Sequence, residues 1–303
     1  TFRMVCLTIG LLGAGVAAPA LVASGSRASY SLMAILLGML MFVAAIVALI
    51  SIKGLGKFMT SEGKDDTKVH LGLVAGIKFA WADRNFRFLV LSYLFTGATT
   101  HLFLAAVPFF AEYVFGSAKI TSVFMGAFLV PALISTPIWL KVSLRIGKQR
   151  GLLICQLTFL LGTLALLLGP VIGLAPTVLI VVVLGSAFGG LQLFAFSMVP
   201  DVARAASPDG SMAGSYTGVW TATEATGTAF GPYIYAAVIG LGGFVAVTAG
   251  QEVVQTPTAQ AALLLGFTVV PAVLMFIALI FQRKYKLDQA LSSQVGEQAA
   301  AAQ

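Results

Sequence analysis

The chain has 303 residues, of which 59% are hydrophobic and only 10% are charged. Soluble domains carry roughly 25% charged residues, so this composition excludes an ordinary soluble protein and indicates one embedded in a membrane. The net charge of +7 does not indicate a nucleic-acid partner. The lysines and arginines lie in short segments between apolar runs, where they set orientation in the bilayer.

The apolar runs are about 20 residues long, which is the length that crosses the hydrocarbon core as a helix. Strand-length alternation of polar and apolar residues is absent, which argues against an outer-membrane barrel. We therefore expect an all-α integral membrane protein with about eight transmembrane helices. The first run is a full span without a cleavage site, so it does not read as a secretory signal, and the start at Thr1 suggests a fragment.

The expected spans follow one another with mostly short polar loops between them. They cover about residues 4–24, 32–52, 88–115, 121–140, 152–168, 177–199, a stretch between 212 and 244, and 261–281. The basic segment KVSLRIGKQR (141–150) and the segment PDVARAASPDGS (200–211) are predicted to be loops. The one long polar segment, 53–87, is predicted to begin as a flexible linker and to finish as an interfacial helix that ends at Asp83.

Lysine and arginine are divided unevenly between the two sets of alternating loops. The richer set consists of Arg3, the 53–87 segment, the 141–150 segment, Arg204 and the cations of 283–286. The other set contains only Arg27 and Lys119. The positive-inside rule therefore predicts a multi-pass protein of the plasma (inner) membrane with its C-terminus in the cytoplasm.

The segment from 201 to 244 is the most informative, because an acid, Glu224, lies inside an apolar helix. A carboxylate at bilayer depth needs a partner, a proton or a cavity. Helical spacing puts Tyr216, Trp220 and Glu224 on one stripe, with Thr223 and Gly227 beside them. One interpretation is a face that lines a polar, solute-binding cavity. The other is a tight helix–helix seam in which Glu224 is protonated or paired.

Two further polar residues within expected spans are candidate site residues. Gln192 could face a solute, or it could make a hydrogen bond between helices. His101 could face the cavity and carry protons near neutral pH, or it could be a neutral histidine satisfied inside the bundle. Thr99 and Thr100 are expected to bond to their own helix backbone.

Four stretches, taken in this order and spacing, resemble the glycoside–pentoside–hexuronide:cation symporters. This family is the melibiose-permease-like branch of the major facilitator superfamily. The stretches are TIGLLGAGVAAPALV (8–22), LGLVAGIKFAWADRNFRFLVLSYLF (71–95), RIGKQR (145–150) and the segment from SMVPDV through GVWTATEATGTAFGP (197–232). The likeness covers nearly the whole chain.

The resemblance implies that the chain corresponds to helices five to twelve of the twelve-helix fold. Residues 1–53 would then be the last two helices of the N-terminal bundle, and 54–85 a cytoplasmic linker with an interfacial helix. Residues 86–282 would be the six-helix C-terminal bundle, and 283–303 a cytoplasmic tail. The family's cation-coordinating carboxylates lie mostly in its first four helices, so no metal or cation ligand is assigned here.

Two departures from the family pattern bear on the site. Many relatives carry a lysine after the acid of helix eleven, where this chain has Ala225 after Glu224, and its loss favours proton linkage through the acid. Relatives often show two aspartates three residues apart after helix ten, where this chain has Asp201 and Arg204. These two residues could form a salt bridge of a cytoplasmic gate, or a solvated loop pair of little energetic weight.

The basic turn is assigned to the same side of the membrane as this pair. Arg145 and Lys148, together with Lys141 and Arg150, are expected to anchor the topology and to act as a cytoplasmic latch.

The first hypothesis for function is a symporter that couples H⁺ or Na⁺ to the movement of a sugar or glycoside by alternating access. Sugars offer hydroxyl rims and apolar ring faces, which the groups of Trp220, Glu224 and Gln192 suit. The resemblance also leaves open another solute, such as an organic anion or a lysolipid, or a non-transporting scaffold. We expect no enzyme, because HExxH, GxSxG and cysteine clusters are absent. We also expect no cofactor beyond the coupling ion, and a monomer in the lipid bilayer.

Overall fold

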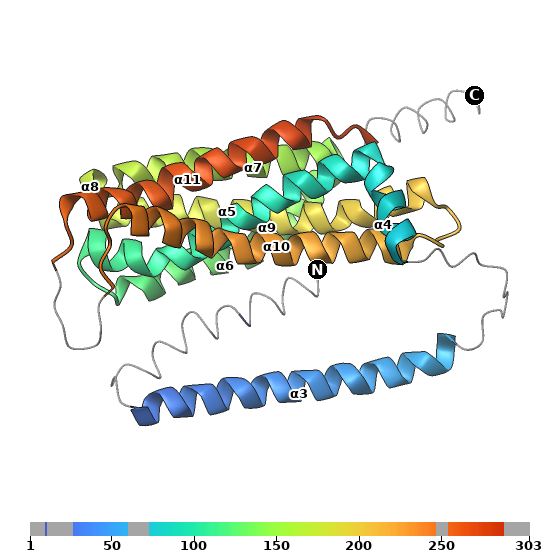
Figure 1. The fold of residues 1–303 in the computed structure, drawn as a ribbon, viewed down its shortest axis with the longest axis horizontal. Coiled ribbons are helices and arrows are strands. Elements are labelled where there is room, and N and C mark those ends of the chain that lie inside the picture. Colours follow the sequence, from blue (N-terminus) through green and yellow to red (C-terminus); the bar gives the residue numbers. More distant parts are fainter. Residues whose placement is uncertain (1–9, 11–26, 60–72, 247–253, 288–303) are drawn as a thin grey trace. The chain divides into compact units, whose positions relative to one another are not determined.

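The computed structural model describes residue 10 and residues 27–59, 73–246 and 254–287 (Figure 1). The described helices divide into two units, one containing α3 (Arg27–Met59) and the other containing all later helices. The first expected span, about 4–24, lies outside the described residues apart from residue 10. The predicted boundary at 54–85 therefore stays a prediction, since residues 60–72 are also outside them.

The second unit is built from long helices that lie side by side (Figure 1). Its elements are α4 (Leu73–Ala82), α5 (Arg84–Phe115), α6 (Ile120–Ile146), α7 (Lys148–Ala165), the 3-10 turn η2 (Leu166–Leu168), α8 (Gly169–Ile172), α9 (Leu174–Ala206), α10 (Ala213–Leu241) and α11 (Pro257–Arg283). The described residues contain no strand, which confirms the all-α class.

Six helical stretches of the described chain are long and apolar enough to cross a membrane. They are Ala28–Val47, Arg84–Phe115, Ile120–Ile146, Lys148–Ile172, Leu174–Ala206 and Pro257–Arg283. Each coincides with an expected span. Helix α10 is also long enough, with 29 residues or about 43 Å, but its many Gly and Thr residues make it less apolar than these six.

Three segments predicted to be loops or linker are largely helical. Helix α3 continues to Met59, so residues 53–59 are not a flexible linker. Helix α9 continues to Ala206 through Pro200, where a loop was expected. The predicted basic loop at 141–150 is two helix ends joined at Gly147, whose φ of 85° and ψ of 160° suit glycine. The interfacial helix is present as α4, and Asp83 follows it as the N-cap of α5.

Two groups of three helices make up the long-helix bundle of the second unit. Helix α5 packs on α10 and α11, and α9 packs on α6 and α7. Contact between α7 and α11 joins the two groups. The opposed α5 and α9 are the most buried of the candidate spans, so they form the inside of the bundle.

Phenylalanine rings fill the centre of this bundle. Phe267 of α11 stacks on Phe103 and Phe110 of α5, with ring centroids 4.8 and 4.3 Å apart. Phe103 also meets Phe128 of α6 and Phe159 of α7, at 5.0 and 5.7 Å. All five side chains are at most 1% exposed. Aromatic packing of this kind contributes beyond simple area burial and fixes how the helices face one another.

The contact between α5 and α10 depends on glycines that bring the two backbones together. A Cβ at Gly231 would lie 2.5 Å from the carbonyl oxygen of Ala98. A Cβ at Gly227 would lie 2.9 Å from the carbonyl oxygen of Leu94. Small residues at four-residue spacing are the usual device for close helix packing in membranes. We call this contact the glycine seam.

We predict that Gly231→Ala lowers the free energy of unfolding by about 1–3 kcal/mol, because the new methyl group meets backbone that must shift. Thermal unfolding of the purified protein in detergent measures the effect. The control is Gly218→Ala in the same helix, where a Cβ would meet nothing within 4 Å. Alanine there should be neutral or stabilising, since it favours the helix by roughly 0.5–1 kcal/mol. Equal melting temperatures for the two variants would contradict the seam.

Candidate functional site

Helix α10 packs against α5 along one face. The stripe predicted from helical spacing, from Tyr216 through Trp220 and Glu224 to Gly227, lies on this face. Tyr216, Trp220 and Gly227 are buried, and Thr223 and Glu224 are half-buried. The opposite face is exposed within its unit. The stripe therefore has three parts with different surroundings: Tyr216 at one end, the turn from Trp220 to Glu224 in the middle, and the glycine seam beyond.

The middle part belongs to a cluster that joins three helices. The indole of Trp220 stacks on the ring of Tyr93 from α5, with centroids 4.1 Å apart and planes inclined by 22°. Phe196 of α9 meets Trp220 edge-on at 5.5 Å and Tyr93 at 5.6 Å. The Tyr93 hydroxyl donates to Oε1 of Gln192, also from α9, at 3.2 Å. We call these four residues the Trp220 cluster.

The indole N–H of Trp220 has no hydrogen-bond partner, although the residue is only 3% exposed. A buried donor left unpaired costs about 1–3 kcal/mol, so an incoming acceptor would be favoured there. The hydroxyl of Tyr235 and the side-chain amide of Gln282 are buried and unpaired as well. Trp220 differs from them in its neighbours. Its ring stacks on Tyr93, whose hydroxyl bonds to Gln192, and it lies one helical turn from Glu224.

The two remaining groups of the middle part differ in what they can offer a solute. The hydroxyl of Thr223 donates to the carbonyl of Val219 at 2.8 Å, so its proton is already used by its own helix. Glu224 is half-buried and is therefore reachable from outside the bundle of its unit. Tyr93 thus links Trp220 to Gln192, and Glu224 lies one helical turn from Trp220 on α10. Thr223 is a poorer donor than the sequence alone suggests.

His101 lies in the contact between α5 and α10, next to the glycine seam. Its Nδ1 is 2.9 Å from the carbonyl oxygen of Gly97, and because a carbonyl only accepts, Nδ1 carries a proton. Its Nε2 lies 3.4 Å from the hydroxyl of Thr228 on α10. Both ring nitrogens thus have protein neighbours, which favours the interpretation as a satisfied histidine. Thr99 and Thr100 bond to carbonyls of their own helix, at 2.8 and 3.1 Å, as predicted.

Tyr216 lies away from the Trp220 cluster, at the end of the bundle where α5 begins. It is fully buried, meets Phe86 edge-on at 4.5 Å and donates to Oδ2 of Asp83 at 3.2 Å. The other oxygen of Asp83 caps α5 by accepting from the backbone N–H groups of Asn85 and Phe86. Tyr216 therefore holds the start of α10 against the start of α5, and the structure does not bring it together with Gln192.

A cavity of about 400 Å³ lies at this same end. Its lining is mostly apolar and consists of Phe79, Ala82, Asp83, Asn85, Val202, Ala205, Ala206, Tyr216 and Leu287. Tyr216 is the member of the predicted stripe that lines it; Trp220 and Glu224 do not. This cavity is thus separate from the Trp220 cluster.

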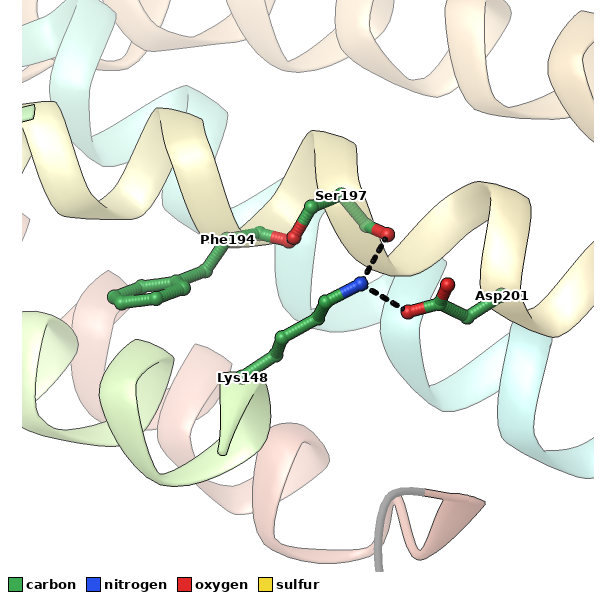
Figure 2. A network of polar contacts seen from close by, with 4 residues as sticks. All are labelled: Lys148, Phe194, Ser197 and Asp201. Atoms are coloured by element: carbon green, nitrogen blue, oxygen red, sulfur yellow. Dashed lines mark hydrogen bonds and ion pairs between the residues drawn. The ribbon is translucent and has the colours of Figure 1, made fainter. Parts of the chain in front are cut away.

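Asp201 forms an ion pair with Lys148, which the sequence did not predict (Figure 2). The Lys148 Nζ lies 2.5 Å from Oδ2 of Asp201 and also donates to the carbonyl of Ser197 at 3.2 Å. The pair joins the start of α7 to α9. Arg204, the partner considered from the sequence, is exposed on the last turn of α9, and Arg145 is exposed near the end of α6. Of the two alternatives considered for Asp201 and Arg204, the salt bridge between them is not formed, because Asp201 pairs with Lys148.

Sequence reasoning missed three residues that shape the site: Tyr93, Phe196 and Asp83. Tyr93 and Phe196 lie in apolar runs, where an aromatic residue gives no sign that it faces a tryptophan on another helix. Asp83 did carry a signal, because an acid immediately before a helix start is a preferred N-cap.

We predict that Lys148 and Asp201 are coupled by about 0.2–1 kcal/mol, the range of partly exposed pairs, since their side chains are 36% and 26% exposed. Thermal unfolding of Lys148→Ala, Asp201→Ala and the double variant measures this as a double-mutant cycle. Arg204→Ala combined with Asp201→Ala is the matched control and should be additive. Additive effects for Lys148 and Asp201 too would show that the pair contributes nothing.

Comparison with known proteins identifies the family. The sequence model of a family described as MFS/sugar transport protein matches residues 1–289. The search of curated proteins gave no significant match. The family match, the six helices of the described chain that are long and apolar enough to cross a membrane, and the resemblance to the melibiose-permease-like branch agree with one another. The chain belongs to the MFS/sugar transport family of multi-pass membrane transporters.

Proposed function

We propose that the protein is a symporter that couples H⁺ or Na⁺ to the movement of a sugar or glycoside across the plasma (inner) membrane. The observation that carries this proposal is the unpaired, buried N–H of Trp220, whose ring stacks on Tyr93, the hydrogen-bond partner of Gln192, one helical turn from Glu224. The description of the family as sugar transport proteins supports the solute class.

The residues of the cluster suit a sugar in complementary ways. The Trp220 N–H offers a donor to a hydroxyl oxygen, and the Gln192 amide, oriented by Tyr93, offers further polar atoms. The Glu224 carboxylate accepts from sugar hydroxyls when it is charged and can take up a proton. Neutralising an acid at mid-membrane lowers the cost of moving it between the two access states, which links proton binding to transport. No other cofactor and no covalent chemistry are needed, and one copy of the protein suffices.

We further propose that the end of the bundle where α5 and α10 begin faces the cytoplasm. Contacts that tie helix ends together there include Tyr216 to Asp83 and the backbone N–H of Lys286 to Asn85. Arg84, Arg87, Arg145, Lys148, Arg150, Arg204, Arg283, Lys284 and Lys286 all lie in helix ends or turns at this end. By the positive-inside rule, this concentration supports a cytoplasmic C-terminus. The Lys148–Asp201 pair would then be part of a cytoplasmic gate.

A second candidate solute is an organic anion or a lysolipid. It is favoured by Ala225, where many relatives carry a lysine next to the acid, and by the cavity at the basic end, whose lining is mostly apolar. Uptake of a labelled lysolipid that sugars do not compete with would favour this candidate. A protein that moves neither solute would be a scaffold.

We predict that Glu224→Gln abolishes gradient-driven accumulation of a labelled sugar while leaving membrane insertion intact, because glutamine cannot release or accept the coupled proton. Uptake is measured in vesicles containing the full-length protein, with a proton gradient, a sodium gradient or neither. The control is Glu112→Gln, which removes an exposed carboxylate of α5 and should leave accumulation unchanged. If Glu224→Gln accumulates sugar normally, the acid does not carry the coupled proton. The alternative, in which Glu224 only takes part in a tight helix–helix contact, would then remain.

We predict that Trp220→Phe weakens apparent sugar affinity about tenfold, the effect of losing one hydrogen bond worth about 1.4 kcal/mol. Phenylalanine keeps a ring to stack on Tyr93, so the change reports mainly on the N–H. The control is Trp139→Phe, because the N–H of Trp139 already donates to the Ser186 carbonyl at 2.8 Å. Trp139→Phe should lower the stability of the protein but leave its sugar affinity unchanged. If Trp220→Phe also leaves the affinity unchanged, the indole N–H of Trp220 does not bind the sugar.

A further inference from the structure

Three cationic side chains surround a single phenyl ring at the basic end of the bundle. The guanidinium carbons of Arg84 and Arg87 lie 5.7 and 5.9 Å from the centroid of the Phe88 ring. The ammonium nitrogen of Lys284 lies 5.7 Å from the same centroid. Two cations come from the first turns of α5 and the third follows α11, so residues about 200 positions apart in sequence converge on one ring. We call these four residues the Phe88 cluster.

The charges of this cluster are not balanced within the described part of the chain. Each cation lies within 6 Å of the ring centre, so any two lie within twice that distance of each other and repel. In residues 73–246 and 254–287, none of the three makes an ion pair with a carboxylate. The neighbouring acid, Asp83, is engaged elsewhere, capping α5 and accepting from Tyr216. An anion bound by the three cations would relieve this repulsion.

The position of the cluster selects the kind of anion. Both α5 and α11 are membrane-crossing helices, and the three cations lie at their ends, where lipid phosphates are found. Helix α4, which leads into α5, exposes Ile77 and Trp81, the kind of side chains that enter the headgroup region. A lipid head group therefore meets this surface at high local concentration, whereas a dissolved anion does not.

We propose that Arg84, Arg87 and Lys284, which gather around the Phe88 ring, bind the phosphate of an anionic phospholipid. The planar guanidinium groups can each donate two hydrogen bonds to phosphate oxygens, and the lysine adds a point charge. A lipid whose head group also carries a positive charge would be repelled by the same three residues. The site thus selects phosphatidylglycerol over phosphatidylcholine, and it holds the ends of α5 and α11 together from outside.

Native mass spectrometry of the purified protein, titrated with phosphatidylglycerol or phosphatidylcholine, tests this proposal. The wild-type protein should bind phosphatidylglycerol more tightly than phosphatidylcholine, and phosphatidylglycerol should raise its melting temperature. Each of Arg84→Gln, Arg87→Gln and Lys284→Gln should weaken phosphatidylglycerol binding roughly fivefold, the effect of losing one direct hydrogen bond to the phosphate, worth about 1 kcal/mol. The triple variant should lose both the preference and the thermal shift.

The matched control is the triple variant Lys141→Gln, Arg145→Gln, Arg150→Gln, which removes the same charge at the same end and should bind as wild type does. The double variant Arg84→Lys, Arg87→Lys keeps both charges and should retain most of the binding. It therefore distinguishes loss of charge from misfolding.

Equal loss of binding in the two triple variants, or equal binding of the two lipids, would overturn the proposal. Equal thermal protection by inorganic phosphate would overturn the lipid assignment. These readouts involve no transport, so they fail or succeed independently of the symporter proposal.

Discussion

In a bilayer, helices gain little by burying apolar side chains against one another, because the lipid tails are just as apolar. Close van der Waals contact between backbones has to replace that driving force. In this protein the glycine seam supplies it for α10, where Gly227 and Gly231 lie against the backbone of α5. The stacking of Trp220 on Tyr93, two turns along the same helix pair, depends on this approach, and so does the contact between His101 and Thr228. A wider separation of α5 and α10 would disperse the candidate site.

Buried polar side chains complement this packing by fixing how the helices are aligned. The amide of Gln156 on α7 donates to the hydroxyls of Ser92 and Thr96 on α5, at 3.0 and 3.1 Å. The amide of Gln149 on the same helix donates to carbonyls at the end of α11. In a dry interior such bonds specify one alignment, because a shifted helix would leave them unmade. The unpaired N–H of Trp220 contributes to no such alignment, so it stays available to a solute.

Much of this architecture could be predicted from the sequence, because the length of an apolar run is set by the thickness of the bilayer. The helix ends could not, since helices α6 and α9 continue past their apolar runs into polar residues such as Lys141 and Asp201, which a search for apolar runs counts as loop. For the site, helical spacing correctly placed Trp220 and Gly227 on one buried face. It could not show which residues of other helices meet that face, so Tyr93 and Phe196 were missed. Nor could it show that Asp201 pairs with Lys148 and not with Arg204.

The join between α6 and α7 consists of one residue, Gly147, between two helices. A one-residue connection cannot lengthen, so a shift of either helix along its axis has to move the other helix as well. Lys148, the first residue of α7, is in turn held by Asp201 and the Ser197 carbonyl of α9 (Figure 2). Helices α6, α7 and α9 are thereby connected at one end. If this half of the bundle moves, we expect the three helices to move together as one rigid group.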